Sequence, residues 1–261
     1  SRIPLTSSSL SRESTPPTSP RFDMNMEDFF WNSRDRIDQV LQDEIEIAEI
    51  KTIPEIHDFP FRNGFIETSV LFVDLRGSLD LTEEHRRSTA ARIHKCFLNE
   101  MVHAARYWNG KIGRFAGNKI MVLSNADGRQ ANRAIDIAIT MQTIVEHILS
   151  PRLEKIYKEK VACGIGIDLG KILVAKVDNN HELIWAGGPT DVASKLADEA
   201  KRGEIRVTDR IYDRLRDDLR KPGWWEKTGI KVMGKNETVY CNHGLYKTAV
   251  ENILKKHVIV L

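Results

Sequence analysis

The run Ser69-Val-Leu-Phe-Val-Asp-Leu75 gathers β-branched and large apolar residues and carries a single acid near its end. Residues of these types favour strands, and a short apolar run bounded by a turn signal is typical of a buried strand. Arg76-Gly77-Ser78 follows, and its small residues indicate a turn that enters a helix. We therefore expect a fold that combines buried strands with helices.

Strand and helix signals alternate after this run. In chain order they predict a helix, a hairpin, a second helix and a second hairpin, at residues 83–108, 111–115 with 119–123, 128–149, and 161–168 with 171–177. Pro189 stands where a first helical residue would and predicts another helix. Short strands are expected at 205–207, 225–232 and 238–241. The order βαββαβ with added strands predicts an α+β fold of the ferredoxin-like kind.

The ends of the chain differ from this regular part. Residues 1–22 are rich in Ser, Thr, Pro and Arg and predict a flexible tail, either natural or left by expression. Apolar spacing predicts a helix between about 26 and 50, which either supports oligomerisation or covers one edge of the sheet. We divide the chain into a tail (1–22), an N-terminal helix and connector (23–62), a main domain (63–245) and a C-terminal helix or extension (246–261).

The composition excludes several classes of protein. Lys plus Arg number 39 and Asp plus Glu 37, so the net charge is +2, which argues against a protein that coats nucleic acid. No apolar run reaches the length of a membrane span, and no signal peptide is recognised. The three cysteines lie far apart without a CxxC pair. We therefore expect neither a zinc ribbon nor a membrane association, and a reducing cytoplasm as the location.

Two segments carry residues suited to phosphate chemistry. Asp74 ends a buried strand before a small-residue turn, where a carboxylate can hold a metal beside backbone N–H groups that suit a phosphate. The alternative is that Asp74 only caps the turn. Asn118 lies at the tip of Arg114-Phe-Ala-Gly-Asn-Lys119, and it adjoins Asp74 if this hairpin pairs with the strand of Asp74. Gly-Asn is also a usual pair for a tight turn.

A third segment, Trp185-Ala-Gly-Gly-Pro-Thr-Asp-Val-Ala-Ser-Lys-Leu196, predicts a helix with polar residues on one face. Asp191 and Lys195 are four residues apart and share that face, whereas Val192 and Leu196 lie on the adjoining buried stripe. The simplest interpretation of Asp191 and Lys195 is an exposed ion pair worth about 0.3–0.5 kcal/mol.

Together these segments resemble a class III nucleotide cyclase homology domain between Glu67 and Tyr240. The similar segments are the first metal motif, the Lys-x-x-Gly-Asp hairpin, the Gly-Ile-x-x-Gly hairpin, the helix with the transition-state Asn and Arg, and the closing Lys-Gly hairpin, at residues 72–78, 114–121, 163–170, 187–196 and 231–240 respectively. The resemblance implies a homodimer with active sites at its interface. It also implies two divalent cations per site, Mn²⁺ or Mg²⁺, and a nucleoside triphosphate whose ribose 3′-hydroxyl attacks the α-phosphate.

The resemblance assigns roles residue by residue. The metal ligands would be Asp74, the carbonyl of Leu75 and Asn118, and the partner protomer would present Asp191 and Lys195 as catalytic groups. The residues implied in nucleotide binding are Phe72, Arg76, Gly77, Ser78, Arg114, Trp185 and Lys235.

Departures from the family pattern concern metal and phosphate binding. Asn118 stands where the second metal acid belongs, and a neutral amide lowers affinity for a hard dication. We interpret the chain as an Asn118 variant of an active enzyme, of the kind used to hold substrate without turnover, with natural loss of activity as the alternative. Asp191 and Lys195 replace the transition-state Asn and Arg, and lysine cannot grip a phosphate bidentately. Met233 stands at or near the phosphate-binding lysine, which leaves Lys231 or Lys235 as the substitute.

A further departure concerns the base. Arg114 replaces the adenine-reading Lys, and its acidic partner falls at Leu183 or Ile184, neither of which accepts a hydrogen bond from an amine. The pattern is similar to the bacterial pyrimidine cyclases of the Pycsar anti-phage system, which implies synthesis of a cyclic pyrimidine nucleotide that a separate cyclic-nucleotide-binding effector detects. We favour UTP, because Arg114 can donate to uracil O4. The alternatives are a cytidylate cyclase, a purine cyclase, and a catalytically dead dimeric sensor that binds nucleotide.

Overall fold

The computed structural model describes residues 26–42, 47–55, 63–76, 87–176 and 182–243. The chain divides into two compact units, residues 1–45 and 46–261, which are described separately. In the first unit, helix α1 (Met26–Gln42) has no buried residue. None of the helices in the described ranges is long and apolar enough to cross a bilayer.

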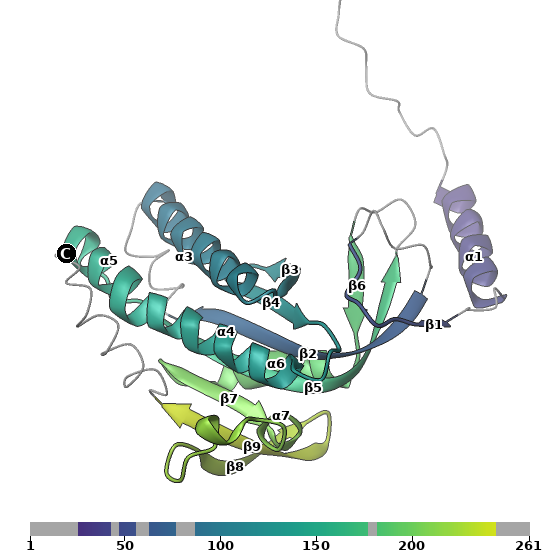
Figure 1. Ribbon diagram of the computed structural model, residues 1–261. Helices are drawn as coiled ribbons and strands as arrows, with labels where there is room; N and C mark the ends of the chain where they lie inside the picture. The colour runs from purple at the N-terminus through teal and green to yellow at the C-terminus, as the bar shows by residue number, and fades with distance from the viewer. Residues whose placement is uncertain (1–25, 43–46, 56–62, 77–86, 177–181, 244–261) are drawn as a thin grey trace, which may run out of the picture. The chain divides into compact units, whose positions relative to one another are not determined.

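The second unit is built on one sheet, to which the described residues contribute nine strands. Its order is β3 (Lys111–Ala116), β4 (Lys119–Ser124), β2 (Asn63–Arg76), β5 (Ala162–Lys176), β7 (Glu204–Thr208), β9 (Lys235–His243) and β8 (Glu226–Val232). The order of β3, β4, β2 and β5, with helices after β2 and β4, is the ferredoxin-like arrangement (Figure 1). The α+β prediction is therefore confirmed.

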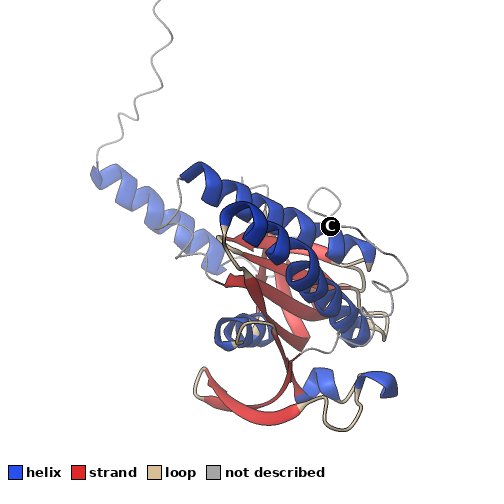
Figure 2. Cartoon of the chain, turned by 90° about the vertical axis from the view of Figure 1, so that its left-hand side faces the viewer, coloured by secondary structure: helices blue, strands red, loops and turns tan. Residues whose placement is uncertain are grey.

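One face of the sheet is covered by α3 (Arg87–Tyr107) and by a long helical segment (Figure 2). That segment consists of α4 (Gln130–Ile144), a π-helical turn (Val145–Leu149) and α5 (Ser150–Tyr157). Side chains at helical spacing pack on alternate residues of β2 and β5, among them Ile93, Phe97, Met101, Ala134, Ile135 and Ala138. The two helices expected from apolar spacing are therefore confirmed, while residues 83–86 lie outside the described part.

The opposite face is covered by α6 (Gly188–Glu199). Ala193 and Ala197 pack in a cluster with Phe72, whereas Val192 and Leu196 pack on the strands β8 and β9. The buried stripe expected for this helix is thus confirmed. Asp74 and Gly164 are directly opposed in the antiparallel β2–β5 pair, at the end of the sheet where the C-terminus of α6 lies.

Two predictions at the edges of this fold are wrong. Residues 161–177 do not form a hairpin about Gly170, because β5 is one strand that pairs with β2 along its whole length, from Arg76↔Ala162 to Asn63↔Ala175. The short strand β6 (Leu183–Ala186) pairs instead with the end of β5. The N-terminal helix ends at Gln42 and not near residue 50, since β1 (Ile47–Glu49) pairs parallel with the start of β2.

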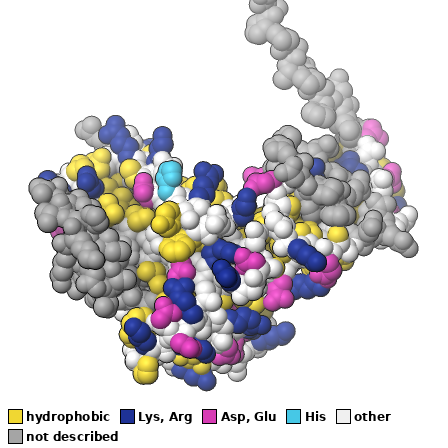
Figure 3. Space-filling model, in the orientation of Figure 1, with side chains coloured by type: hydrophobic (Ala, Val, Ile, Leu, Met, Phe, Trp, Pro, Cys, Tyr) yellow, Lys and Arg dark blue, Asp and Glu magenta, His cyan; other side chains and the backbone are white. Residues whose placement is uncertain are grey.

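The remaining elements follow β7. A short helix, α7 (Asp209–Tyr212), and a 3-10 turn (Asp217–Leu219) precede the β8–β9 hairpin. The extension expected at 246–261 lies outside the described residues. Basic and acidic side chains are interspersed over the face seen in Figure 3, in keeping with the near-balanced charge.

Candidate functional site

Asp74 and Asn118 lie side by side at one end of the sheet. β2 and β4 pair antiparallel with Asp74 opposite Lys119, which brings the β3–β4 tip beside the end of β2. The Asn118 amide nitrogen donates to Asp74 Oδ1 at 2.7 Å and to the carbonyl oxygen of Leu75 at 2.9 Å. The backbone N–H of Leu75 donates to the carbonyl of Asn118 at 3.3 Å. The predicted proximity of position 118 to Asp74 is therefore confirmed.

The carboxylate of Asp74 is almost enclosed, with 4% of the residue exposed. Burial raises its pKa above the ordinary value, while the nearby charges of Arg76 and Lys119 lower it and that of Asp198 raises it. Arg76 Nη1 donates to Asp74 Oδ2 at 2.9 Å, so each carboxylate oxygen already has a donor.

These residues offer oxygen ligands suited to a hard divalent cation. No group of three or more His, Cys, Asp or Glu side chains in the described part could hold a metal. The available donors are one carboxylate, one backbone carbonyl and one amide oxygen, and Mg²⁺ is commonly held by one or two carboxylates with substrate phosphates. Asn118 presents its NH₂ group toward Asp74 and Leu75, so its amide must turn over before its oxygen can face a cation. The set fits a divalent cation, with one negative charge fewer than a pair of acids would supply.

A pocket of about 450 Å³ lies between α6 and the β8–β9 hairpin. Its lining residues are Asp191, Ser194, Lys195, Asp198, Lys231, Val232 and Met233. Asp191 and Lys195 are exposed as predicted, and Lys195 forms an ion pair with Glu199 at 3.1 Å. Neither Asp74 nor Asn118 is among the described residues that line this pocket.

The turn of the β8–β9 hairpin carries the residues that replace the expected Lys-Gly pair. Met233 and Gly234 have φ values of 48° and 81°, which is the type I′ arrangement that requires positive φ at both central residues. Met233 is 80% exposed at the pocket mouth. Of the two candidate lysines, Lys231 lines the pocket, and Lys235 pairs with Val232 on the neighbouring strand. The sequence analysis assigned Lys235 to nucleotide binding, with Lys231 as the other candidate, whereas it is Lys231 that lines this pocket.

The predicted base-reading residues lie on the same face of the sheet as α6. The Arg114 guanidinium sits 5.9 Å from the ring centroid of Phe72, which is 1% exposed. Trp185 on β6 is also buried, at 4% exposure, in the cluster that contains Phe72, and its Nε1 has no hydrogen-bond partner in the described structure. Ile184 is half exposed and Leu183 packs against that cluster, so β6 supplies no carboxylate at either position.

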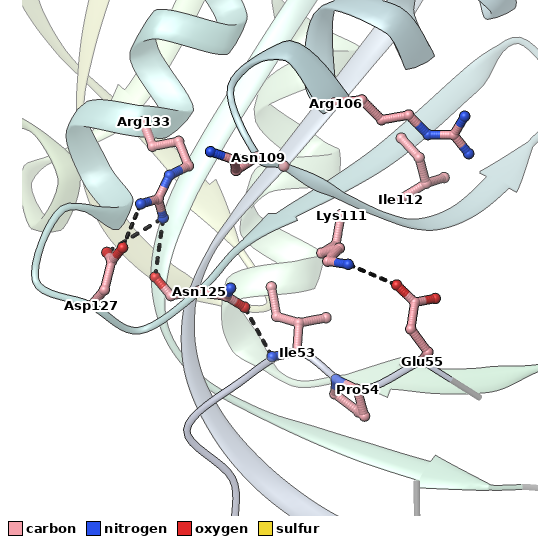
Figure 4. A pocket seen from close by; sticks show the side chains of 11 residues that line it. Ile53, Pro54, Glu55, Arg106, Asn109, Lys111, Ile112, Asn125, Asp127 and Arg133 are labelled. Carbon is pink, nitrogen blue, oxygen red and sulfur yellow. Dashed lines mark hydrogen bonds and ion pairs between the residues drawn. The ribbon is translucent and has the colours of Figure 1, made fainter. Parts of the chain in front are cut away.

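The remaining predicted nucleotide-binding residues follow Asp74 and Leu75 in the chain. Arg76 is committed to contacts within the chain, through Asp74 and the last carbonyls of α6. Gly77 and Ser78 lie outside the described residues. A larger pocket of about 720 Å³ opens at the other end of the β3–β4 hairpin (Figure 4). Its walls carry the Lys111–Glu55 and Arg133–Asp127 ion pairs and none of the predicted site residues.

Residues 63–243 match the sequence profile of the adenylate and guanylate cyclase catalytic domain. The chain belongs to this family of nucleotide cyclases. A uridylate cyclase of Gulbenkiania mobilis is 27% identical over 201 residues, which cover 70% of this chain and 78% of the relative. A uridylate cyclase of Burkholderia cepacia is 24% identical over 201 residues, which cover 71% of this chain and 87% of the relative.

Solved structures agree with this assignment at the level of the fold. The crystal structure of the adenylyl cyclase CyaB from P. aeruginosa superposes with a TM-score of 0.61 at 22% identity, over 69% of this chain and 95% of that chain. The resemblance inferred from the sequence is therefore confirmed. Members of the family use divalent metal ions, and the donor set around Asp74 is compatible with that chemistry.

Proposed function

We propose that this chain is a pyrimidine nucleotide cyclase that converts UTP into 3′,5′-cyclic UMP and pyrophosphate. The carrying observation is the environment of Arg114. Its guanidinium stands over the Phe72 ring, and the strand that would supply a carboxylate to an adenine amine carries Leu183 and Ile184 instead. A guanidinium offers donors only, and uracil presents O2 and O4 as acceptors. The uridylate cyclases among its relatives support the same substrate.

The reaction places different demands on the two groups of residues. Asp74, the carbonyl of Leu75 and Asn118 would hold divalent cations together with the triphosphate. When bound, Mg²⁺ or Mn²⁺ lowers the pKa of the ribose 3′-hydroxyl and offsets charge on the phosphates. The 3′-oxygen forms a bond to the α-phosphorus, the bond to pyrophosphate breaks, and the hydroxyl proton leaves to solvent.

The second group would act on the same substrate from a second copy of the chain. Asp191 would orient the ribose by accepting hydrogen bonds from the ribose hydroxyl groups. Lys195 would place its positive charge beside the α-phosphate, where negative charge develops during the reaction. Lys231 or Lys235 would bind the outer phosphates. We propose a homodimer because the resemblance to class III cyclases implies one, and the pocket lined by Asp191 and Lys195 does not include Asp74 or Asn118 among its described lining residues.

Asn118 would limit turnover in this chain. With its NH₂ group bonded to Asp74 and Leu75, the amide occupies the oxygens that a cation needs. This contact also favours a second candidate function, a nucleotide-binding dimeric sensor without catalysis. If the enzyme is active, its cyclic product would signal to a separate cyclic-nucleotide-binding effector in anti-phage defence.

A turnover assay tests the proposal. The chain and its Asn118→Asp variant are each incubated with ATP, GTP, CTP or UTP and Mn²⁺ or Mg²⁺, and cyclic products are identified by mass spectrometry. We expect cyclic UMP from UTP, with a much higher rate in Asn118→Asp. Asn109→Asp, which adds a carboxylate at the far end of β3, is the matched control and should not change the rate. Cyclic CMP or a cyclic purine nucleotide would change the assigned substrate. Nucleotide binding without any product would contradict the cyclase proposal and favour the nucleotide-binding sensor.

A further inference from the structure

Arg76, the last residue of β2, joins two parts of the candidate site. One end of its guanidinium donates to Asp74 Oδ2 at 2.9 Å through Nη1. Nη2 donates to the carbonyl oxygens of Asp198 and Ala200, both at 2.9 Å, and also contacts that of Ala197. One planar group therefore holds the carboxylate at the end of β2 and the last turn of α6 at the same time.

The contact at α6 has a clear physical basis. The last carbonyls of a helix lack intrahelical partners, and a cation near them also interacts favourably with the helix dipole. The side chain reaches these carbonyls across Gly164 of β5. A Cβ on Gly164 would lie 2.7 Å from Nη2 and 2.9 Å from Nε of Arg76. Glycine at this position thus leaves the space that the guanidinium fills.

A second tether reinforces the first. Lys119, which follows Asn118 at the start of β4, forms an ion pair with Asp198 on the same last turn of α6. The C-terminal end of α6 is therefore tied to β2, which carries Asp74 and Leu75, and to the start of β4, next to Asn118. The same helix carries Asp191 and Lys195 on its exposed face.

We infer that Arg76 is a positioning residue, which fixes the Asp74 carboxylate relative to α6 instead of contacting nucleotide. The inference deepens the proposed function and rests on it where turnover is concerned. With Oδ2 held by Arg76, Oδ1 faces Asn118 and the metal position. With the last turn of α6 held as well, the Asp74 carboxylate of one proposed site keeps a fixed spacing from the helix that the same chain would present to the other site. Contact between Arg76 and phosphates would require the guanidinium to give up these bonds.

The first test does not depend on catalysis. Hydrogen–deuterium exchange is followed in peptides covering residues 196–203 of the full chain and of Arg76→Met and Arg76→Lys. Both variants should exchange these amides about tenfold faster, because neither side chain can bond to Asp74 and the helix end together. Arg216→Met is the matched control, since Arg216 pairs with Asp136 outside the site. Unchanged exchange in both Arg76 variants would overturn the inference.

The second test measures turnover of UTP with Asn118→Asp as the parent. We expect Arg76→Met to lower kcat about 10–100-fold, as for other groups that orient a metal ligand, with KM for UTP within about twofold. Arg76→Lys should resemble Arg76→Met, because a single ammonium does not replace a planar group that bonds to Asp74 through Nη1 and to the end of α6 through Nη2. A raised KM with unchanged kcat would assign Arg76 to nucleotide binding and overturn the inference. If the parent forms no product from any nucleotide, the proposed function fails, and the exchange experiment alone decides the role of Arg76.

Discussion

The amide nitrogen of Asn118 lies 2.7 Å from Oδ1 of Asp74, on the side of the carboxylate opposite to Arg76. A hydrogen-bond donor thus occupies the position that a cation would take between these two residues. In a family that uses divalent ions, this contact places a neutral group where a second carboxylate would add charge. We therefore expect the residue at position 118 to decide whether the chain only binds a nucleotide or also converts it.

Replacing Asn118 by Asp should strengthen cation binding even without nucleotide. The added carboxylate supplies two ligand oxygens and removes the donor that competes for Asp74 Oδ1. We expect the dissociation constant for Mn²⁺ to fall at least about tenfold, or about 1.4 kcal/mol. Electron paramagnetic resonance of free Mn²⁺ measures it directly. An equal gain in Asn109→Asp would show a general charge effect and contradict the assignment of position 118.

The sequence predicts Asn118 beside Asp74 because antiparallel pairing of neighbouring segments leaves little freedom at a tight hairpin. It does not predict the contacts of Arg76 with the end of α6, because Asp198 and Ala200 lie 122 and 124 residues further along the chain and the contacts depend on the space left by Gly164. The same dependence on long-range contacts explains why the hairpin predicted about Gly170 is wrong. Leu169-Gly170 between two apolar runs is typical of a turn, but β2 offers backbone partners along residues 162–175, and that long-range pairing keeps the strand extended.

Trp185 illustrates a different limit. The resemblance to cyclases implies a nucleotide contact, whereas the structure places this ring in the apolar cluster under α6. Burial depends on β6 pairing with β5, and no local pattern in residues 183–186 indicates that pairing. Conversely, the buried stripe of α6 follows directly from apolar spacing, because helix periodicity is a local property.

Mixed dimers should show that each active site draws on two chains. In the Asn118→Asp parent, Asp74→Asn removes the proposed metal carboxylate and Lys195→Met removes the ammonium proposed to face the phosphate, so each variant alone should be inactive. Half of the randomly mixed dimers contain one of each, and one of their two sites is intact. The mixture should therefore regain about a quarter of the parent activity. Asp191→Ala mixed with Lys195→Met, both altered on α6, should stay inactive. No recovery in the first mixture would place the whole site within one chain.

Gly166 should be required for the close packing of α6 on the sheet. A Cβ at this position would collide with the carbonyl oxygen of Ala193 and the amide nitrogen of Ala197, both of which are backbone atoms. We expect Gly166→Ala to lower the free energy of unfolding by about 1–3 kcal/mol or more, measured in urea. Gly188→Ala, at the start of α6, is the matched control, because a Cβ there meets no atom within 4 Å. Equal effects of the two changes would show that helix seating is not the cause.

Glu204 should contribute stability that depends on pH. Burial opposes its ionisation, but hydrogen bonds from the N–H of Lys201 and from Arg206, with the nearby charges of Arg206 and His243, hold its pKa below the ordinary value. A carboxyl whose pKa is lowered by folding stabilises the protein above its unfolded pKa and loses that contribution as pH falls through the folded pKa. Glu204→Gln should therefore cost about 1.5–3 kcal/mol of unfolding free energy at pH 7, and the difference should narrow in acid.

Urea unfolding of both proteins between pH 7 and about pH 3, which extends below the ordinary pKa of a Glu carboxyl, measures this difference, with the exposed Glu226→Gln as the control that should change little. A gap between Glu204→Gln and the parent that stayed constant down to the lowest pH would contradict the argument. In that case the ionised carboxylate of Glu204 would not be the stabilising group, and the loss would have to come from side-chain packing at a position that is 2% exposed.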